Sequence, residues 1–142
     1  MRFLLDTHTF LWFILDNPKL SPVAKALIEN PENSRILSMA SIWEMSIKNS
    51  IGKLTFEQPF ETFLPYQLHL NRIELLDIKL THALAILNLP HHHRDPFDRL
   101  IIAQSMVENL PVITVDSTFK MYPIEILWYN LPTATTNEEI SE

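Results

Sequence analysis

Apolar residues along the chain alternate between short runs typical of buried strands and stretches with helical spacing. The strand-like runs are residues 2–6, 35–38, 73–78, 112–115 and 124–128. Helical spacing follows Thr7 and returns near residues 23–30, 41–50, 59–70, 82–87 and 96–109. This alternation predicts an α/β sandwich with a mainly parallel sheet. We expect residues 1–130 to form one domain and the polar residues 131–142 to be a disordered tail.

Turn and capping signals support several of these helix boundaries. Ser21 before Pro22 places a capping hydroxyl ahead of proline at a first helical position. Gly52 follows the third helical stretch and suits a left-handed cap. Ser41 and Glu44 are spaced as a capping box, which predicts a helix beginning at about Ser41.

Composition narrows the chemistry. The 142 residues include no Cys and a single Gly, which excludes disulfides, zinc ribbons, thiolate nucleophiles and the glycine-rich loops that bind ATP, GTP or NAD. The net charge of −6 argues against a broad nucleic-acid footprint, so any such contact would be local. The longest apolar run, residues 10–15, is too short to span a membrane. We expect a cytoplasmic protein without membrane contact.

Four carboxylates occupy similar predicted positions. Asp6 and Asp116 end strands, whereas Glu44 and Asp98 lie in the first turns of helices. Each alone is explained by helix capping. In a parallel sheet, however, all four fall on the edge where such folds bind ligands, and their convergence requires a neutralising cation. Without Cys, a carboxylate site favours Mg²⁺ or Mn²⁺.

Four segments carrying these acids resemble one known family. They are Leu4-Leu5-Asp6-Thr7-His8, Ser41-Ile42-Trp43-Glu44, the block from His92 to Gln104 (HHRDPFDRLIIAQ), and Val115-Asp116. In this order the chain resembles PIN-domain ribonucleases, specifically VapC-like toxins of type II toxin-antitoxin systems. The resemblance implies a three-layer sandwich with five parallel strands and metal-dependent endonucleolytic cleavage of RNA. It also implies an acidic metal site of Asp6, Glu44, Asp98 and Asp116, a cognate antitoxin and a homodimer.

Other residues near the acids have both plain and functional interpretations. Lys48 shares a helix face with Glu44 and could contact a phosphate or simply pair with that acid. Arg99 and Thr7 are further candidates for substrate contact. A surface charge or an ion pair would also explain Arg99, and helix capping would explain Thr7. Asp95 precedes Pro96 and is explained as a cap. The run of histidines at 91–93 is interpreted as loop structure or weak RNA contact, because three adjacent side chains cannot converge.

Two further observations leave alternatives open. Trp12 and Trp43 add apolar surface near the acidic edge, which either packs in the core or meets a second copy or partner helix.

Acids and Mg²⁺ also meet at strand ends in aspartate-based phosphatases and in receiver domains. The phosphatase pattern places a second acid where this chain has His8, and the receiver pattern fails at Ser38 and Asp116. A non-catalytic metal-binding module is the remaining alternative.

Overall fold

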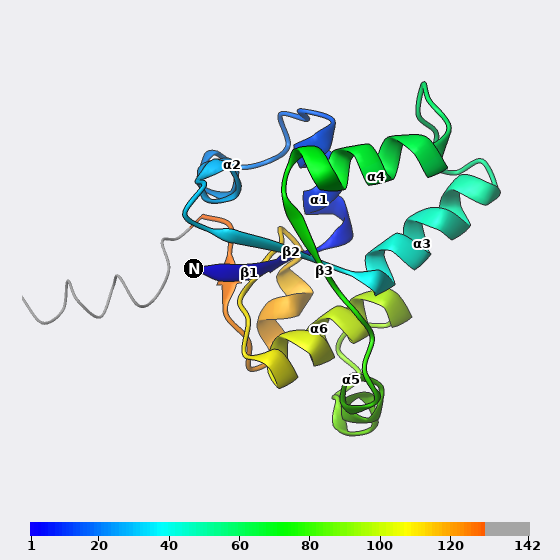
Figure 1. Ribbon diagram of the computed structural model, residues 1–142. Helices are drawn as coiled ribbons and strands as arrows, with labels where there is room; N and C mark the ends of the chain where they lie inside the picture. Colours follow the sequence, from blue (N-terminus) through cyan, green and yellow to red (C-terminus); the bar gives the residue numbers. More distant parts are fainter. Residues whose placement is uncertain (130–142) are drawn as a thin grey trace, which may run out of the picture.

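The computed structural model describes residues 1–129, so the tail predicted for residues 131–142 lies outside the described part of the chain. Five short strands form one sheet in the order β3-β2-β1-β4-β5, and every neighbouring pair is parallel (Figure 1). The strands are β1 (Arg2–Leu5), β2 (Ser34–Ser38), β3 (Ile73–Leu76), β4 (Val112–Ile113) and β5 (Ile126–Leu127). The predicted α/β architecture with a parallel sheet is confirmed.

Helices connect successive strands and cover both faces of the sheet (Figure 1). They are α1 (Thr7–Ile14), α2 (Pro22–Glu29), α3 (Met39–Ser50), α4 (Phe60–Leu70), α5 (Leu80–Ala85) and α6 (Pro96–Glu108), with short 3-10 helices η1 (Ile86–Asn88) and η2 (Ser117–Met121). Within residues 1–129, none of these helices combines the length and apolar character needed to cross a bilayer.

The alternation of strand side chains creates two cores. Phe3 and Leu5 of β1 point to one face and pack in a cluster with Phe10 of α1. Leu4, between them, points to the other face and packs in a cluster with Ile101 of α6. This period of two buries both faces of the central strand, which explains why β1 is almost uniformly apolar. The result is the three-layer sandwich that the family resemblance implied.

Most predicted boundaries agree with the structure, but the capping box is wrong. Ser21 caps α2 by accepting a hydrogen bond from the Ala24 N–H at 3.1 Å, and Gly52 has a φ of 75° just beyond α3. Helix α3, however, begins at Met39, because Ser38 at the end of β2 accepts from the Ala40 N–H at 3.0 Å. Glu44 therefore lies in the second turn of α3, not the first.

The strand order places the carboxyl ends of β1 and β4 side by side. From β1 the chain builds β2 and β3 on one side and β4 and β5 on the other. Leu5 pairs with Ile113, so the residues that follow these two strands emerge next to each other. Reversals of strand order of this kind are where open α/β sheets bind ligands.

Candidate active site

Asp6 lies at the turn between β1 and α1 and is held from two sides. Its Oδ1 atom caps α1 by accepting from the Thr9 N–H at 2.8 Å, and its Oδ2 atom accepts from the Thr114 hydroxyl at 2.5 Å. The side chain is buried, and this burial raises the pKa of Asp6 although both hydrogen bonds oppose the rise. The capping interpretation is therefore correct, but it leaves a buried carboxylate whose charge lacks full compensation.

Glu44 projects from α3 and is only 4% exposed. The Thr7 hydroxyl donates to its Oε1 atom at 2.8 Å and lies 2.9 Å from Ser41 Oγ. Lys48, one turn further along α3, places its Nζ atom 2.7 Å from Glu44 Oε2. Both carboxylate oxygens thus have a partner, and the carboxylate is fixed in orientation.

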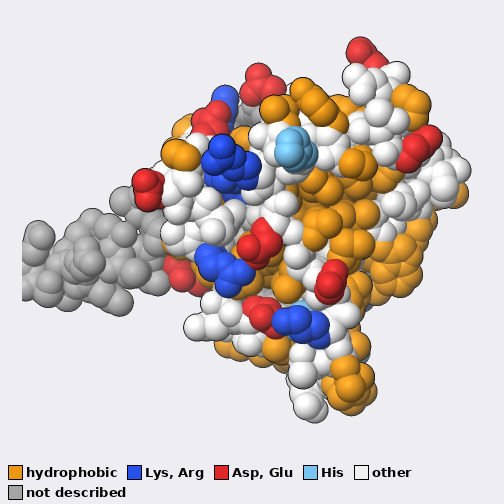
Figure 2. Space-filling model, viewed as in Figure 1, with side chains coloured by type: hydrophobic (Ala, Val, Ile, Leu, Met, Phe, Trp, Pro, Cys, Tyr) orange, Lys and Arg blue, Asp and Glu red, His pale blue; other side chains and the backbone are white. Residues whose placement is uncertain are grey.

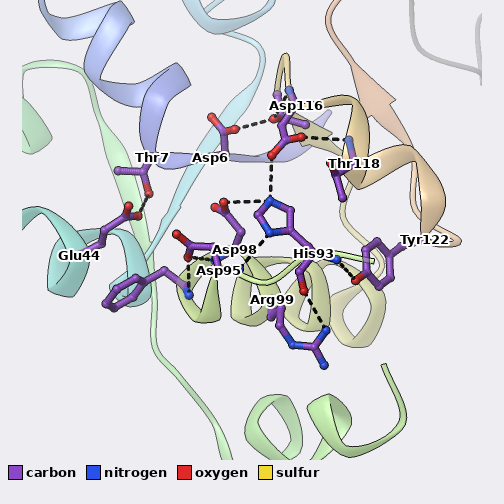
Figure 3. A network of polar contacts seen from close by, with 12 residues as sticks. Asp6, Thr7, Glu44, His93, Asp95, Asp98, Arg99, Asp116, Thr118 and Tyr122 are labelled. Carbon is purple, nitrogen blue, oxygen red and sulfur yellow. Dashed lines mark hydrogen bonds and ion pairs between the residues drawn. The ribbon is translucent and has the colours of Figure 1, made fainter. Parts of the chain in front are cut away.

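Asp98 and Asp116 meet at His93. Asp98 lies in the first turn of α6, and Asp116 caps η2 by accepting from the Thr118 N–H at 2.9 Å. His93 Nε2 lies 3.2 Å from Asp98 Oδ2 and 2.8 Å from Asp116 Oδ2 (Figure 3). The ligating atoms of these three residues all lie within 4.8 Å of one another, a group that could hold a metal ion.

The acids influence one another electrostatically. Burial raises the pKa of Asp98 to about 7, helped by the negative charges of Asp95, Asp6 and Glu44 and opposed by His93. Burial would also raise the pKa of Asp116, but hydrogen bonds from the Thr118 N–H and His93 outweigh it and lower the pKa. Figure 3 shows the carboxylates of Asp6, Glu44, Asp98 and Asp116 around one space.

This donor set fits a hard divalent cation. Carboxylate oxygens are the ligands that Mg²⁺ and Mn²⁺ prefer. Burial, together with the charges of neighbouring acids, raises the pKa of Asp98, so a cation there would offset an unfavourable negative charge. Asp6 and Glu44 lie outside the group formed by His93, Asp98 and Asp116. Their carboxylates nevertheless face the same space as that of Asp98 (Figure 3), and their charges help to raise its pKa.

Asp95 does what its position before Pro96 predicts. One carboxylate oxygen, Oδ1, accepts from the Phe97 N–H at 2.8 Å and from the Asp98 N–H at 3.1 Å. These bonds satisfy two N–H groups at the start of α6. Asp95 therefore serves as the N-cap of α6.

Two of the three predicted substrate contacts lie in unfavourable places. The Arg99 guanidinium is 8% exposed and donates to the carbonyls of Pro90, His93 and Leu89 at 3.0, 3.2 and 3.4 Å. It braces the loop before α6 and has little surface left for RNA. Thr7 is likewise buried and is occupied by Glu44. Lys48, whose side chain is 41% exposed, keeps a place at the rim of the acids.

His93 is the residue that the sequence interpretation missed. It was grouped with His91 and His92, both exposed, whereas His93 is half-buried and contacts two of the acids. The available signal was its position two residues before the cap Asp95, inside the same block as Asp98. Loop residues have no periodicity, so spacing alone does not separate one of three adjacent histidines from the others.

Comparison with known proteins identifies the family. Residues 3–125 match the PIN domain. Because this match covers most of the 142 residues, the chain belongs to the PIN domain family. No curated protein matches the chain.

Several solved structures have the same fold at low sequence identity. A chain of VapBC2 from Rickettsia felis, bound to a DNA fragment from their promoter, has a TM-score of 0.65 and 18% identity, covering 90% of this chain and 99% of that chain. DNA-bound VapBC from Salmonella typhimurium has a TM-score of 0.67 and 19% identity, and the match covers 89% of this chain and 97% of that chain. VapBC-5 from Mycobacterium tuberculosis is a member of the VapBC family of toxin-antitoxin systems. It has a TM-score of 0.57 and 20% identity, and the match covers 89% of this chain and 98% of that chain.

Proposed function

We propose that this PIN-domain protein is a metal-dependent endoribonuclease and the toxin of a type II toxin-antitoxin pair. The observation that carries the nuclease proposal is the gathering of the Asp6, Glu44, Asp98 and Asp116 carboxylates around one space beside the carboxyl ends of β1 and β4 (Figure 3), where burial and neighbouring charges raise the pKa of Asp98 to about 7. The likeness to several VapBC structures supports the toxin assignment. An acidic group of this kind costs stability unless a cation compensates it, so a purely structural role does not explain it.

Asp6, Glu44, Asp98 and Asp116 are the residues that would hold Mg²⁺ or Mn²⁺. When bound, such an ion supplies a Lewis acid that polarises a phosphodiester oxygen and lowers the pKa of a water. The chain prepares for it by fixing the acids in advance: Thr114 and Thr9 hold Asp6, and Thr7 holds Glu44. Burial and the neighbouring acids raise the pKa of Asp98 to about 7, and a bound cation would favour its ionised form.

The RNA contact is expected to be local, because the chain has a net charge of −6. Lys48 brings an ammonium group to the rim of the acids, 2.7 Å from Glu44. In this position it can pair with a phosphate that approaches the site, at the cost of loosening its bond to Glu44. Arg94, His91 and His92 are exposed on the loop that leads to Asp98 and offer further contacts.

An apolar surface near the acids supports the antitoxin as partner. Trp43 and Ile47 of α3, and Ile51 just beyond its end, recur every four residues and are 55%, 40% and 60% exposed. Figure 2 shows hydrophobic side chains gathered over α1, α3 and α4 on the face drawn. A groove of about 490 Å³ is lined by Leu15, Thr55, Phe56, Glu57, Gln58 and Phe63. We propose that an amphipathic antitoxin segment covers this surface, burying Trp43 against it. Trp12, by contrast, packs on the core.

The homodimer remains a prediction of the family resemblance. Its measurement is the molar mass of the isolated chain by light scattering over a range of concentrations.

The proposed activity is tested by incubating the purified chain with RNA in Mg²⁺ and in EDTA, with DNA of the same sequence as the control. We expect cleavage of RNA in Mg²⁺, no cleavage in EDTA and no cleavage of DNA. Cleavage that persists in EDTA would reject the metal-dependent proposal. The partner is tested by adding the small protein encoded beside this chain, which should suppress cleavage, and suppress it less when Trp43→Asp removes the apolar contact.

A further inference from the structure

His93 joins two acids that come from different parts of the fold. Asp98 lies in α6 and Asp116 follows β4, yet His93 Nε2 lies within 3.2 Å of an oxygen of each. We propose that His93 is a positioning residue, whose Nε2–H fixes the carboxylates of Asp98 and Asp116 for the cation without ligating it. This inference rests on the proposed function, because it assigns a role at the same site.

The imidazole ring is fixed from its other side. Its Nδ1 atom accepts from the Asp95 N–H at 3.2 Å, and the His93 N–H donates to the Tyr122 hydroxyl at 2.9 Å. The His93 carbonyl accepts from Arg99, and the ring meets Phe119 edge to face at 5.6 Å and 88°. Backbone, side-chain and ring contacts therefore all hold the orientation that points Nε2 at the two acids.

These contacts determine which nitrogen carries the hydrogen. Because Nδ1 accepts a hydrogen bond from the Asp95 N–H, the hydrogen of the neutral ring lies on Nε2. A nitrogen that carries hydrogen can donate to Asp116 Oδ2 and attract Asp98 Oδ2, which lies 3.2 Å away, but it offers no lone pair to a metal. His93 therefore acts through the carboxylates, in the way that residues around a metal site orient its ligands.

The arrangement also lowers the repulsion between the acids. Two carboxylates that approach one another without a cation repel, and the shared N–H donor of His93 attracts both. Loss of such an outer partner typically weakens metal binding by about 10- to 100-fold. We expect His93 to matter for metal affinity to a similar extent.

Three substitutions separate positioning of the acids from support of the loop. His93→Gln carries an amide N–H near the place of Nε2, whereas His93→Asn carries an acceptor near the place of Nδ1 and does not reach the acids. His93→Phe keeps a ring against Phe119 and loses both polar contacts. A role in the loop alone would be preserved best by Asn, and a role in positioning best by Gln.

The readout is the Kd for Mn²⁺ by isothermal titration calorimetry on the full chain, with a thermal melt of each variant to establish that it is folded. We expect the Kd of His93→Gln to stay within about 3-fold of the wild-type value. His93→Asn and His93→Phe should bind Mn²⁺ at least about 10-fold more weakly. An unchanged Kd in Asn and Phe would overturn the inference, as would tighter binding by Asn than by Gln.

Two controls make the outcomes distinguishable. Asp98→Asn should weaken Mn²⁺ binding whatever the role of His93. If Asp98→Asn binds Mn²⁺ weakly and the His93 variants bind it as the wild type does, the inference about His93 is rejected and the proposed function is not. A wild-type chain that binds no Mn²⁺ would reject the proposed function and this inference with it.

Electron spin echo spectroscopy of the Mn²⁺-loaded chain tests the same inference directly. It should show no directly bonded imidazole nitrogen, and such a nitrogen would make His93 a ligand and overturn its positioning role.

Discussion

Thr114, which follows β4, donates its hydroxyl hydrogen to Asp6 Oδ2 across 2.5 Å, although 108 residues separate the two in sequence. The same hydroxyl oxygen accepts from the Asp116 N–H at 3.0 Å. One threonine thus links the acid after β1 to the segment that carries the acid after β4. The parallel pairing of the two strands creates this link, and it places Asp6 and Asp116 on the same edge of the sheet.

The link predicts how Asp6 variants affect stability. Asp6→Asn keeps an acceptor for the Thr9 N–H and can donate to Thr114, and it removes a carboxylate whose pKa is raised by burial. We expect its metal-free stability to equal or exceed that of the wild type. Asp6→Ala loses the cap and should cost about 1 kcal/mol. Urea unfolding in EDTA measures both, and a large loss in Asp6→Asn would contradict the account.

Asp98 should make the metal-free protein less stable as the pH rises. Its pKa is about 7 when folded and about 4 when unfolded, so between these values the folded chain holds a proton that the unfolded chain has lost. This contribution is complete below about pH 4 and is lost as the pH approaches 7. Asn at this position does not titrate, so Asp98→Asn does not lose this stability as the pH rises. In EDTA its melting temperature should exceed that of the wild type at pH 8, and the two should differ less at pH 5. Parallel curves for both proteins would contradict this.

The same variant tests whether Asp98 binds the ion. A ligand that binds only the folded chain raises its melting temperature. We expect Mg²⁺ to stabilise the wild type and to stabilise Asp98→Asn much less. The control is Asp95→Asn, which keeps the cap of α6 and should retain the shift. An equal shift in Asp98→Asn would exclude this residue as a ligand.

Arg99 should contribute to stability and not to RNA binding. Arg99→Met leaves the carbonyls of Pro90, His93 and Leu89 without this donor, which should cost about 2 kcal/mol. Arg94→Met, on the exposed part of the same loop, should change stability by less than about 0.5 kcal/mol. Urea unfolding compares the two. An Arg99→Met chain of normal stability that no longer binds RNA would restore the role first predicted from sequence.

Lys48 should contribute to RNA binding. In an Asp6→Asn background, which we expect not to cleave, Lys48→Met should weaken RNA affinity and reduce the slope of log affinity against log salt by about 1. Lys25→Met is the control, since Lys25 pairs with Asp16, outside the acidic site. Fluorescence anisotropy at several salt concentrations measures the slopes. Equal slopes for Lys48→Met and its parent would mean that the lysine serves only Glu44.

Much of the fold was predictable because its signals are local. The strands carry short apolar runs, and Ser21 with Pro22 marks the start of α2 as predicted. The start of α3 was misplaced because two serines compete for it, and the choice of Ser38 depends on its extended backbone at the end of β2. Sequence spacing contains no information on that backbone conformation.

The site was predictable only as far as the strand ends and helix starts determine it. Asp6 and Asp116 follow neighbouring strands, so their proximity follows from a parallel sheet with this strand order. The roles of His93 and Arg99 depend on the path of the loop before α6, which passes back toward the acids and buries the guanidinium. No periodic pattern predicts the path of such a loop.

The most direct test of a metal-dependent ribonuclease at these acids is RNA cleavage by wild type, Asp6→Asn and Asp95→Asn, each shown to be folded. Asp6→Asn retains the helix cap but loses a charge proposed to hold the ion, whereas Asp95→Asn retains the cap of α6 and loses a charge that is not proposed to hold the ion. The account predicts cleavage in Mg²⁺ by wild type and by Asp95→Asn, and none by Asp6→Asn or by any of them in EDTA. Cleavage by Asp6→Asn at the wild-type rate in Mg²⁺ would contradict it.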